Sequence, residues 1–316
     1  MLKTKNIAVI GGAGFLGSNL VDYLIELGNN VLVLDNFVSG NIENINKKAE
    51  WLEFDIRSSP DVLAALLRNA QINQVYHLAA EPYIPECFER PQEFFEVNAL
   101  GTMNVLLACE KAGVEKALYY SSSEVYGTRE GKITEETPTF PQSTYAVSKL
   151  AGDRLAFTLF KEHKIPVIIL RQFNCYGPRE THEYVIPEII SQLDKSEIIH
   201  LGNIKAERDF LYVEDAVKMA VELMAKGKMG EVYNLGSGSY HSIEQITNWI
   251  AEIMGKEIGI TIDKKRLRPF DVERLWCDNS KIYGAIDYRP KIPFKTGLEK
   301  TINWFYENNC KWGFEK

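Results

Sequence analysis

The sequence feature that most constrains the fold is a glycine-rich stretch, GGAGFLG, at residues 11–17. It follows a short apolar run, NIAVI, and it opens a segment whose apolar residues have helical spacing. Gly11, Gly14 and Gly17 permit a tight turn, a close approach of the backbone to a diphosphate, and close contact between strand and helix. The first N–H groups of such a helix attract phosphates. The stretch therefore predicts a strand–turn–helix unit that binds a dinucleotide.

Short, nearly continuous apolar runs alternate with helical patterns through the first half of the chain. Such runs are typical of strands that are covered on both faces of a parallel sheet. Strands are predicted at 6–12, 31–35, 51–55, 74–80, 116–123 and 167–174, and helices at 16–28, 60–70, 91–112 and 144–163. Repeated strand–helix units with right-handed crossovers predict an α/β fold with a Rossmann-type, doubly wound parallel sheet.

After residue 174 the alternation becomes less regular. The pattern predicts a strand that returns to the sheet at 230–236, a short strand at 256–262, and helices at 183–193, 213–227, 242–255 and 296–308. We expect a dinucleotide-binding domain of residues 1–174 plus about 212–236. A smaller, discontinuous α/β domain of residues 175–211 and 237–316 would then bind the substrate.

The composition argues against several classes of protein. The chain of 316 residues has 36 basic and 43 acidic residues, a formal charge of −7, and we expect no Lys/Arg-rich run and no nucleic-acid partner. Its histidines and cysteines lack metal-ligand spacing, so no metal site is predicted. Five widely spaced cysteines indicate reduced thiols and a cytoplasmic protein. No stretch approaches the roughly 20 apolar residues that span a bilayer, so no membrane partner is expected.

Two carboxylates follow predicted strands near the glycine-rich turn. Asp35 ends the second strand, where a carboxylate can accept hydrogen bonds from both ribose hydroxyls of a dinucleotide. This placement favours NAD over NADP, because the carboxylate would repel a 2′-phosphate. Asp55 ends the third strand and, with Ile56, could flank the adenine. A helix-capping or loop role is equally open for Asp55.

The run YAVSK places Tyr145 and Lys149 four residues apart, on one face of a predicted helix. A nearby ammonium group and a positive nicotinamide ring both favour the phenolate form of tyrosine. Tyr145 could therefore take a proton from a sugar hydroxyl near neutral pH, while Lys149 holds the nicotinamide ribose. The same spacing also occurs on ordinary surface helices. The upstream Ser122 and the glycine-rich turn favour the catalytic interpretation.

Nearly the whole chain resembles the nucleotide-sugar epimerase/dehydratase family of extended short-chain dehydrogenases/reductases. The matching motifs are GGAGFLG, HLAA (77–80), VNALGT (97–102), SSSEVYG (121–127), YAVSK (145–149), RQFNCYGPR (171–179), RDFLYVEDA (208–216) and GEVYNLGSG (230–238). The resemblance implies an enzyme that recycles tightly held NAD and acts on a nucleotide-diphosphate sugar. It also implies a homodimer, formed through a four-helix bundle by the helices at 91–112 and 144–163.

The resemblance also implies roles for individual residues. Ser122 takes the place of the residue that hydrogen-bonds the sugar O4. Arg274 resembles a distal arginine that pairs with the substrate diphosphate, although a solvated arginine would fit the same pattern. The other implied substrate-binding residues are Glu81, Asn174 and Arg208. The implied NAD-binding residues beyond the three glycines are Phe15, Leu16, Asp35, Asn36, Asp55, Ile56, Leu78, Ala79, Ala80, Asn98, Tyr145 and Lys149.

Glu124, two residues after Ser122, bears on which reaction of the family is catalysed. The resemblance implies that Tyr145 takes the O4 proton while hydride leaves C4. A 4,6-dehydratase then needs a carboxylate that removes the C5 proton before water leaves C6. Glu124 falls where such dehydratases and glucuronate decarboxylases carry a glutamate, whereas 4-epimerases generally have a small or uncharged residue. Many dTDP-glucose dehydratases have an aspartate, the leaving-group acid, where this chain has Ser123.

The interpretation is an NAD-dependent nucleotide-diphospho-sugar 4,6-dehydratase with Ser122, Ser123, Glu124, Tyr145 and Lys149 as catalytic residues. The alternatives are a 4-epimerase of the UDP-glucose or UDP-N-acetylglucosamine type, and a UDP-glucuronate decarboxylase. The nucleotide base and the sugar stay unassigned. An NAD-sensing module or a scaffold subunit would not need the serine, carboxylate, tyrosine and lysine together.

Overall fold

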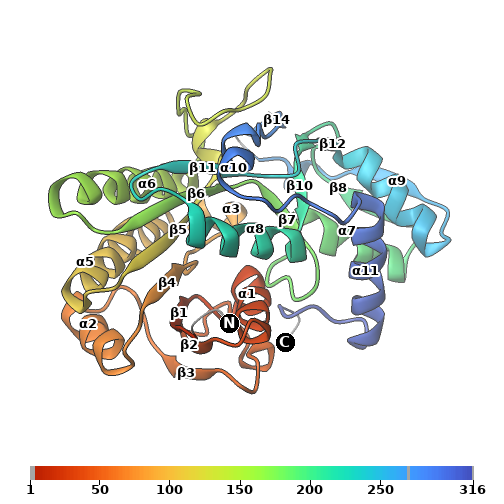
Figure 1. The fold of residues 1–316 in the computed structure, drawn as a ribbon. Helices are drawn as coiled ribbons and strands as arrows, with labels where there is room; N and C mark the ends of the chain where they lie inside the picture. Colours follow the sequence, from red (N-terminus) through yellow and green to blue (C-terminus); the bar gives the residue numbers. More distant parts are fainter. Residues whose placement is uncertain (1–3, 269–270, 315–316) are drawn as a thin grey trace.

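A seven-stranded parallel sheet forms the centre of the fold in the computed structural model, which describes residues 4–268 and 271–314 (Figure 1). Its strands are β1 (Asn6–Ile10), β2 (Asn30–Asp35), β3 (Glu50–Glu53), β4 (Gln74–His77), β5 (Lys116–Ser122), β6 (Val167–Gln172) and β11 (Val232–Leu235). The order is β11-β6-β5-β4-β1-β2-β3. The winding reverses between β1 and β4, which leaves a crevice at the carboxyl edge. The predicted doubly wound α/β fold is confirmed.

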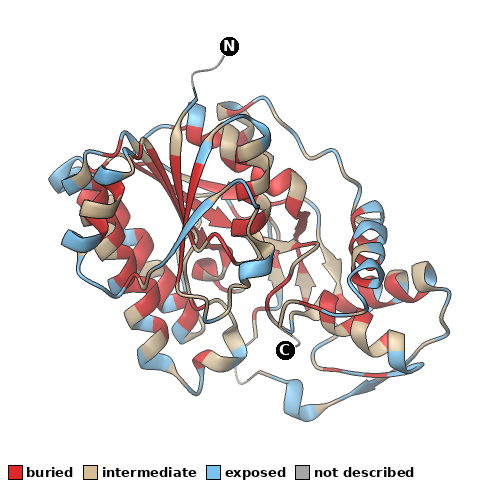
Figure 2. Cartoon of the chain, turned by 90° about the horizontal axis from the view of Figure 1, so that it is seen from below, coloured by how far each residue is buried: buried red, intermediate tan, exposed pale blue. Residues whose placement is uncertain are grey.

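Helices cover both faces of this sheet. One face packs against α1 (Phe15–Glu26) and α8 (Val213–Lys226), and the other against α2 (Pro60–Asn69), α5 (Thr102–Ala112) and α6 (Thr144–His163). Successive residues of β1 serve the two cores in turn, since Ile7 and Val9 belong to one cluster and Ala8 and Ile10 to the other. The buried strands between their helices are red in Figure 2.

The edge strand β3 differs from the prediction that the strands are covered on both faces. All four of its residues are exposed, including Trp51 at 45% and Leu52 at 43%. β3 pairs only with β2, while the helix that follows packs beside α5 rather than over β3. The Trp51 ring instead meets Phe37 edge-on, at 5.5 Å between centroids.

The predicted helix at 91–112 is three segments. They are α4 (Pro91–Phe95), a π-helical segment η2 (Glu96–Gly101), and α5. Within η2 lies the buried Asn98, whose side chain bonds outside the helix to the main chain of Glu81. An extra residue in one turn is a local distortion that often accompanies functional sites.

The other strands form three small sheets beside the large one. β7 (Asn174–Tyr176) pairs with β10 (Phe210–Tyr212), and β8 (Ile198–Leu201) with β13 (Gly259–Ile262). β9 (Glu207–Arg208) lies between β12 (His241–Ser242) and β14 (Arg274–Leu275). The accompanying helices α7 (Val185–Lys195), α9 (Ile243–Met254) and α11 (Phe294–Glu307) lie at the right of Figure 1. We propose that these elements form the smaller substrate domain, at the boundaries expected above.

Short segments complete the chain. They are η1 (Ile42–Asn44), α3 (Ile84–Cys87), η3 (Ser123–Tyr126), η4 (Lys264–Arg266) and α10 (Ser280–Ala285). Among the described residues, no helix is long and apolar enough to cross a lipid bilayer.

Candidate active site

A cavity of about 760 Å³ lies at the carboxyl edge of the large sheet and extends to the small sheets. It is lined by the residues that follow β1, β4, β5 and β6, and by the end of β2. Nineteen of the residues that the sequence singled out line this cavity: Gly11, Gly14, Phe15, Leu16, Gly17, Asp35, Asn36, Ile56, Leu78, Ala79, Ala80, Glu81, Ser122, Ser123, Glu124, Tyr145, Lys149, Asn174 and Arg208. The fold therefore brings the candidate dinucleotide, catalytic and substrate residues to one space.

The glycine-rich turn leaves the start of α1 open to a ligand. Gly11 has a φ of +85°, and a Cβ there would lie 2.5 Å from the backbone nitrogen of Ala79. A Cβ on Gly17 would overlap the carbonyl oxygen of Gly11. Gly14 is the N-cap of α1 and supplies no side-chain cap. The first N–H groups of the helix are therefore available to an anion in the cavity.

Asp35 and Asp55 have different environments. Asp35 is 7% exposed, and its carboxylate accepts hydrogen bonds from the N–H groups of Ala13 and Phe37, both at 2.9 Å. Burial raises the pKa of Asp35, and these hydrogen bonds oppose the shift. Asp55 instead pairs with Arg57 at 2.6 Å and does not line the cavity. Asp55 is therefore a loop carboxylate here, since the adjacent guanidinium satisfies it.

Helix α6 presents Tyr145 and Lys149 to the end of β5. The hydroxyl of Ser143 caps the helix by accepting from the N–H of Ala146, which places Tyr145 in the first turn. The ammonium of Lys149 is 4% exposed and donates to the carbonyl oxygen of Tyr120 at 2.5 Å. Both reactive side chains are therefore buried residues of the cavity lining.

Burial sets the ionisation of this pair. It raises the pKa of Tyr145 to about 12, although a hydrogen bond with Ser122 opposes the rise. It also lowers the pKa of Lys149 to about 7, while the Asp153 carboxylate acts in the other direction. In the protein without NAD the phenol is therefore neutral near pH 7, because desolvation outweighs the hydrogen bond with Ser122. The expectation of a phenolate also depends on the positive nicotinamide ring, and it stays a prediction.

Glu124 lies within electrostatic range of Tyr145 and of two arginines. The hydroxyl of Ser122 accepts from the N–H of Glu124 at 3.2 Å, so the turn of η3 ties the two residues together. Burial raises the pKa of Glu124, and the positive charges of Arg208 and Arg268 oppose the rise. The negative charge of Glu124 in turn raises the pKa of Tyr145. The carboxyl group thus lies within electrostatic range of the phenol.

Cations gather where the smaller sheets meet the cavity. Arg208 is 6% exposed and pairs with Asp271 at 3.0 Å. Lys265, Arg266 and Arg268 also line the cavity. They belong to the run KKRLR at 264–268, so the expectation that the chain has no Lys/Arg-rich run is wrong. This run is the signal by which sequence reasoning could have found the three cations.

Arg274 and Asn98 do not line the cavity. Arg274 forms an ion pair with Glu207, donates to the carbonyl oxygen of Glu130, and lies 4.8 Å from the ring centroid of Tyr240. The pairing of β14 with β9 places Arg274 opposite Glu207. Its predicted contact with the substrate diphosphate stays a prediction. Asn98 is fully buried, and its side chain forms hydrogen bonds with Glu81 and Ser148.

Asn98 connects three elements around the cavity. Its side chain accepts from the N–H of Glu81 at 2.8 Å and donates to the carbonyl oxygen of Glu81 at 3.0 Å. It also donates to the hydroxyl of Ser148, which donates to the carbonyl oxygen of Tyr145. Asn98 therefore fixes the loop after β4 against the first turns of α6.

The cavity residues that sequence reasoning did not single out include two tyrosines and two glutamates from the loops before α3 and α7. Tyr83, Tyr184 and Glu183 come from the loops that precede α3 and α7. The two tyrosine rings meet edge-on at 5.7 Å. Glu180, in the loop before α7, also lines the cavity and is 1% exposed. Aromatic and acidic loop residues carry no spacing signal by which these could have been found.

The geometry supports proton transfer at neighbouring positions of one ligand. A phenol with a serine hydroxyl lies beside a carboxyl group, next to a turn that can hold a dinucleotide diphosphate. Cations on the far side suit a second anionic group. In the described residues, no cluster of His, Cys, Asp or Glu is arranged to hold a metal ion.

Comparisons with known proteins agree with this geometry. A sequence model of the family described as GDP-mannose 4,6 dehydratase matches residues 8–301. The dTDP-D-glucose 4,6-dehydratase of Homo sapiens is 34% identical, covering 98% of this chain and 92% of its own length.

Solved structures include enzymes of two kinds. A dTDP-glucose 4,6-dehydratase from Streptomyces venezuelae, solved with NAD bound, superposes with a TM-score of 0.90 at 29% identity, over 97% of this chain and 98% of its own. A UDP-glucose 4-epimerase from Thermotoga maritima, solved with UDP-glucose, also has a TM-score of 0.90 at 29% identity, over 96% and 99%.

Proposed function

Because the chain belongs to the GDP-mannose 4,6-dehydratase family of nucleotide-sugar epimerases and dehydratases, we propose that it is an NAD-dependent 4,6-dehydratase of a nucleotide-diphosphate sugar. The membership confirms the resemblance seen in the sequence motifs. The observation that carries the choice of reaction is the carboxyl group of Glu124 beside Tyr145 and Ser122. An epimerase needs no such base at C5.

The residues around the glycine-rich turn fit NAD. The uncapped start of α1 suits its diphosphate, and Asp35 suits the hydroxyls of its adenosine ribose. Lys149 and the Leu78–Ala80 segment would hold the nicotinamide half. Bound NAD would accept hydride from C4 of the sugar and return it to C6.

The side chains then divide the proton transfers among them. Tyr145, hydrogen-bonded to Ser122, removes the proton from O4. The ketone at C4 acidifies the hydrogen on C5, and Glu124 removes that proton. Ser123, which is 3% exposed and lines the same cavity, passes a proton to the departing hydroxyl at C6 and regains one from Glu124, which holds the C5 proton. Arg208 and Arg268 hold the substrate diphosphate.

A 4-epimerase is the second candidate, because the Thermotoga maritima structure superposes as well as the dehydratase structure does. The two reactions are separated by incubating the protein with nucleotide sugars in heavy water and recording mass spectra. Loss of one water with one deuterium retained at C5 supports dehydration. An unchanged composition with an inverted C4 contradicts it and indicates an epimerase. Loss of carbon dioxide from UDP-glucuronate alone indicates a decarboxylase.

Replacing Ser123→Ala tests the proton donor at C6. We expect the rate of water loss to fall about 100-fold, the effect of removing a general acid. Exchange of the C5 hydrogen should continue, because Glu124 is intact, so substrate recovered from heavy water should carry deuterium. An unchanged rate of water loss would instead mean that Glu124, once protonated, supplies the proton.

Asp35 should set the preference for NAD. We expect NADP to bind at least about 100-fold more weakly than NAD, because its 2′-phosphate would meet a buried carboxylate. In Asp35→Asn the ratio of the dissociation constants for NADP and NAD should be about 10-fold smaller, as measured by calorimetric titration. The matched control is Asp55→Asn, because Asp55 pairs with Arg57 outside the cavity. Equal affinity of the unaltered protein for both dinucleotides would contradict the assignment.

Arg268 and Arg274 provide a matched test of the diphosphate site. Arg268→Met should weaken binding of a nucleoside diphosphate about 10- to 100-fold, the effect of losing charged hydrogen bonds. Arg274→Met should change it less than about 2-fold, because Arg274 is held by Glu207 outside the cavity. Calorimetric titration measures both, and the reverse ranking would restore the original assignment of Arg274.

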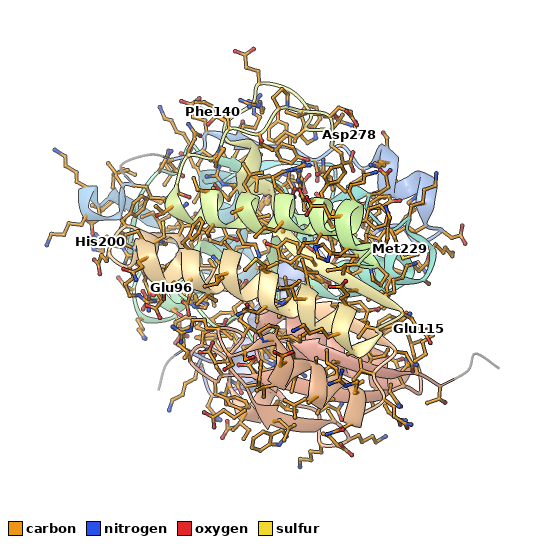
Figure 3. The ribbon with its side chains drawn as sticks, turned by 90° about the vertical axis from the view of Figure 1, so that its left-hand side faces the viewer. Glu96, Glu115, Phe140, His200, Met229 and Asp278 are labelled. Atoms are coloured by element: carbon orange, nitrogen blue, oxygen red, sulfur yellow. The ribbon has the colours of Figure 1, made fainter. Side chains whose placement is uncertain are left out.

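We further propose a homodimer and a cytoplasmic location. Helices α5 and α6 lie side by side on the face seen in Figure 3. Phe95 of α4, Leu100 of η2 and Val147 of α6 are 49%, 44% and 43% exposed, which supports a partner surface for a second copy. Sedimentation equilibrium tests the dimer.

The cytoplasmic location is supported by the cysteines. All five are free thiols, which is typical of proteins in a reducing compartment.

A further inference from the structure

The loop between β7 and α7 carries buried polar atoms that the proposed reaction does not use. Glu180 is 1% exposed and lines the cavity, and its Oε2 has no hydrogen-bond partner among the described residues. The preceding Arg179 has a left-handed φ of 70°, which is strained for a residue with a side chain. Strain and unsatisfied buried groups are retained mainly where function uses them.

Two contacts attach this loop to the helix that follows the glycine-rich turn. Asn19 of α1 donates to the carbonyl oxygen of Pro178 at 3.3 Å. Arg179 pairs with Asp22 of α1 at 2.6 Å. Glu180 therefore follows directly on a segment fixed to α1, and it shares the cavity with the first residues of that helix. The diphosphate of a dinucleotide lies at the N-terminus of this helix in such folds, and Gly14, Phe15 and Glu180 line the same cavity.

Burial favours the neutral form of the Glu180 carboxyl group. Burial raises its pKa well above the usual range, and a backbone hydrogen bond with Gly177 opposes the rise only in part. The titratable groups that interact with it are the Cys175 thiol and the Tyr184 phenol, and burial raises the pKa of both. Arg179 pairs with Asp22 through Nη2, while its buried Nη1 has no hydrogen-bond partner among the described residues. A neutral carboxyl group carries a proton that it can donate.

We propose that Glu180 acts as a carboxylic acid that donates a hydrogen bond to a phosphate oxygen of the NAD diphosphate. The inference rests on the proposed function, because it takes NAD as the dinucleotide bound at α1. An ionised carboxylate at this position would repel the diphosphate. When it is protonated, the Glu180 carboxyl group can therefore bind the diphosphate instead of repelling it.

The test is a calorimetric titration of the full chain, freed of bound dinucleotide, with NAD and without any nucleotide sugar. Glu180→Gln places an uncharged N–H donor at the same position, so its Kd should stay within about 2-fold of the original. Glu180→Met removes the donor and should weaken binding about 3- to 10-fold, the effect of one neutral hydrogen bond. Glu183→Gln, an exposed carboxylate of the same loop, is the matched control. Thermal unfolding of each variant verifies that it is folded.

Infrared difference spectra give an independent readout. NAD should shift a protonated carboxyl band that is absent from the Glu180→Gln protein. The proposal is wrong if Glu180→Gln weakens NAD binding as much as Glu180→Met does, or if neither changes it. It is also wrong if the variants weaken only the binding of UDP or dTDP, which would place Glu180 at the substrate diphosphate. Absence of NAD binding by the unaltered protein would instead contradict the proposed function.

Discussion

Glu124→Gln should stop water loss while leaving the first step intact. The amide keeps the shape of the side chain but cannot take the C5 proton, so product formation should fall about 10²- to 10⁴-fold. Oxidation at C4 should persist, because Tyr145, Ser122 and Lys149 are unchanged. The charge of Glu124 also raises the pKa of Tyr145, so its removal makes the phenol a stronger acid. The absorbance of the reduced form of NAD should therefore appear after substrate is added and should not decay.

The exposed Glu183, also on the cavity wall, gives the control for Glu124. Glu183→Gln removes the same charge from the rim of the cavity and should leave product formation within about 2-fold. Mass spectra in heavy water complete the test, since the Glu124 variant should place no deuterium at C5. Formation of a C4-inverted sugar at the original rate in the Glu124 variant would show that the carboxylate is not a catalytic base and that the enzyme is an epimerase.

Tyr145→Phe should block the reaction before any hydride is transferred. The variant lacks the group that removes the O4 proton, so the rate of C4 oxidation should fall about 10²- to 10⁴-fold. Rapid-mixing absorbance should then detect no reduced nicotinamide after substrate is added. This pattern differs from that of the Glu124 variant, in which the reduced form accumulates. Reduction at the original rate in Tyr145→Phe would assign the proton transfer to another group.

The pH dependence of C4 oxidation follows from the same tyrosine. Burial raises the pKa of Tyr145 to about 12, so the phenol is neutral near pH 7 and its phenolate fraction grows as pH increases. The rate of C4 oxidation should therefore increase between about pH 6 and 9, which single-turnover measurements can test. In Glu124→Gln the same increase in rate should occur at lower pH, because the charge that raises the pKa of Tyr145 is removed. A rate that falls with pH over this range would contradict Tyr145 as the base.

Much of the fold could be predicted because its signals are local. The glycine-rich turn, the apolar strands and the helical runs each depend on neighbours in the sequence, and α6 was predicted at its observed bounds, 144–163. The edge strand β3 shows the limit. Its apolar residues resemble those of central strands, but burial depends on which helix packs over the strand, and that is settled by chain segments far away.

The candidate site divides in the same way. Ser122 and Glu124 follow one strand, and Tyr145 and Lys149 share one helix face, so short-range spacing was enough to select them. Asp55 and Arg274 were selected by comparable patterns, but each forms an ion pair and neither lines the cavity. Which charged group pairs and which stays open depends on the surroundings in three dimensions.

The sequence by itself determined the sheet, the dinucleotide turn and the set of reactive side chains, because backbone geometry and spacing are encoded over a few residues. Only the tertiary structure decided their ionisation and their partners. Burial raises the pKa of Tyr145 and lowers that of Lys149, and Oε2 of the buried Glu180 has no hydrogen-bond partner in the part of the chain that the structure describes. The physical reason is that desolvation depends on every segment that surrounds a group, and those segments come from both ends of the chain.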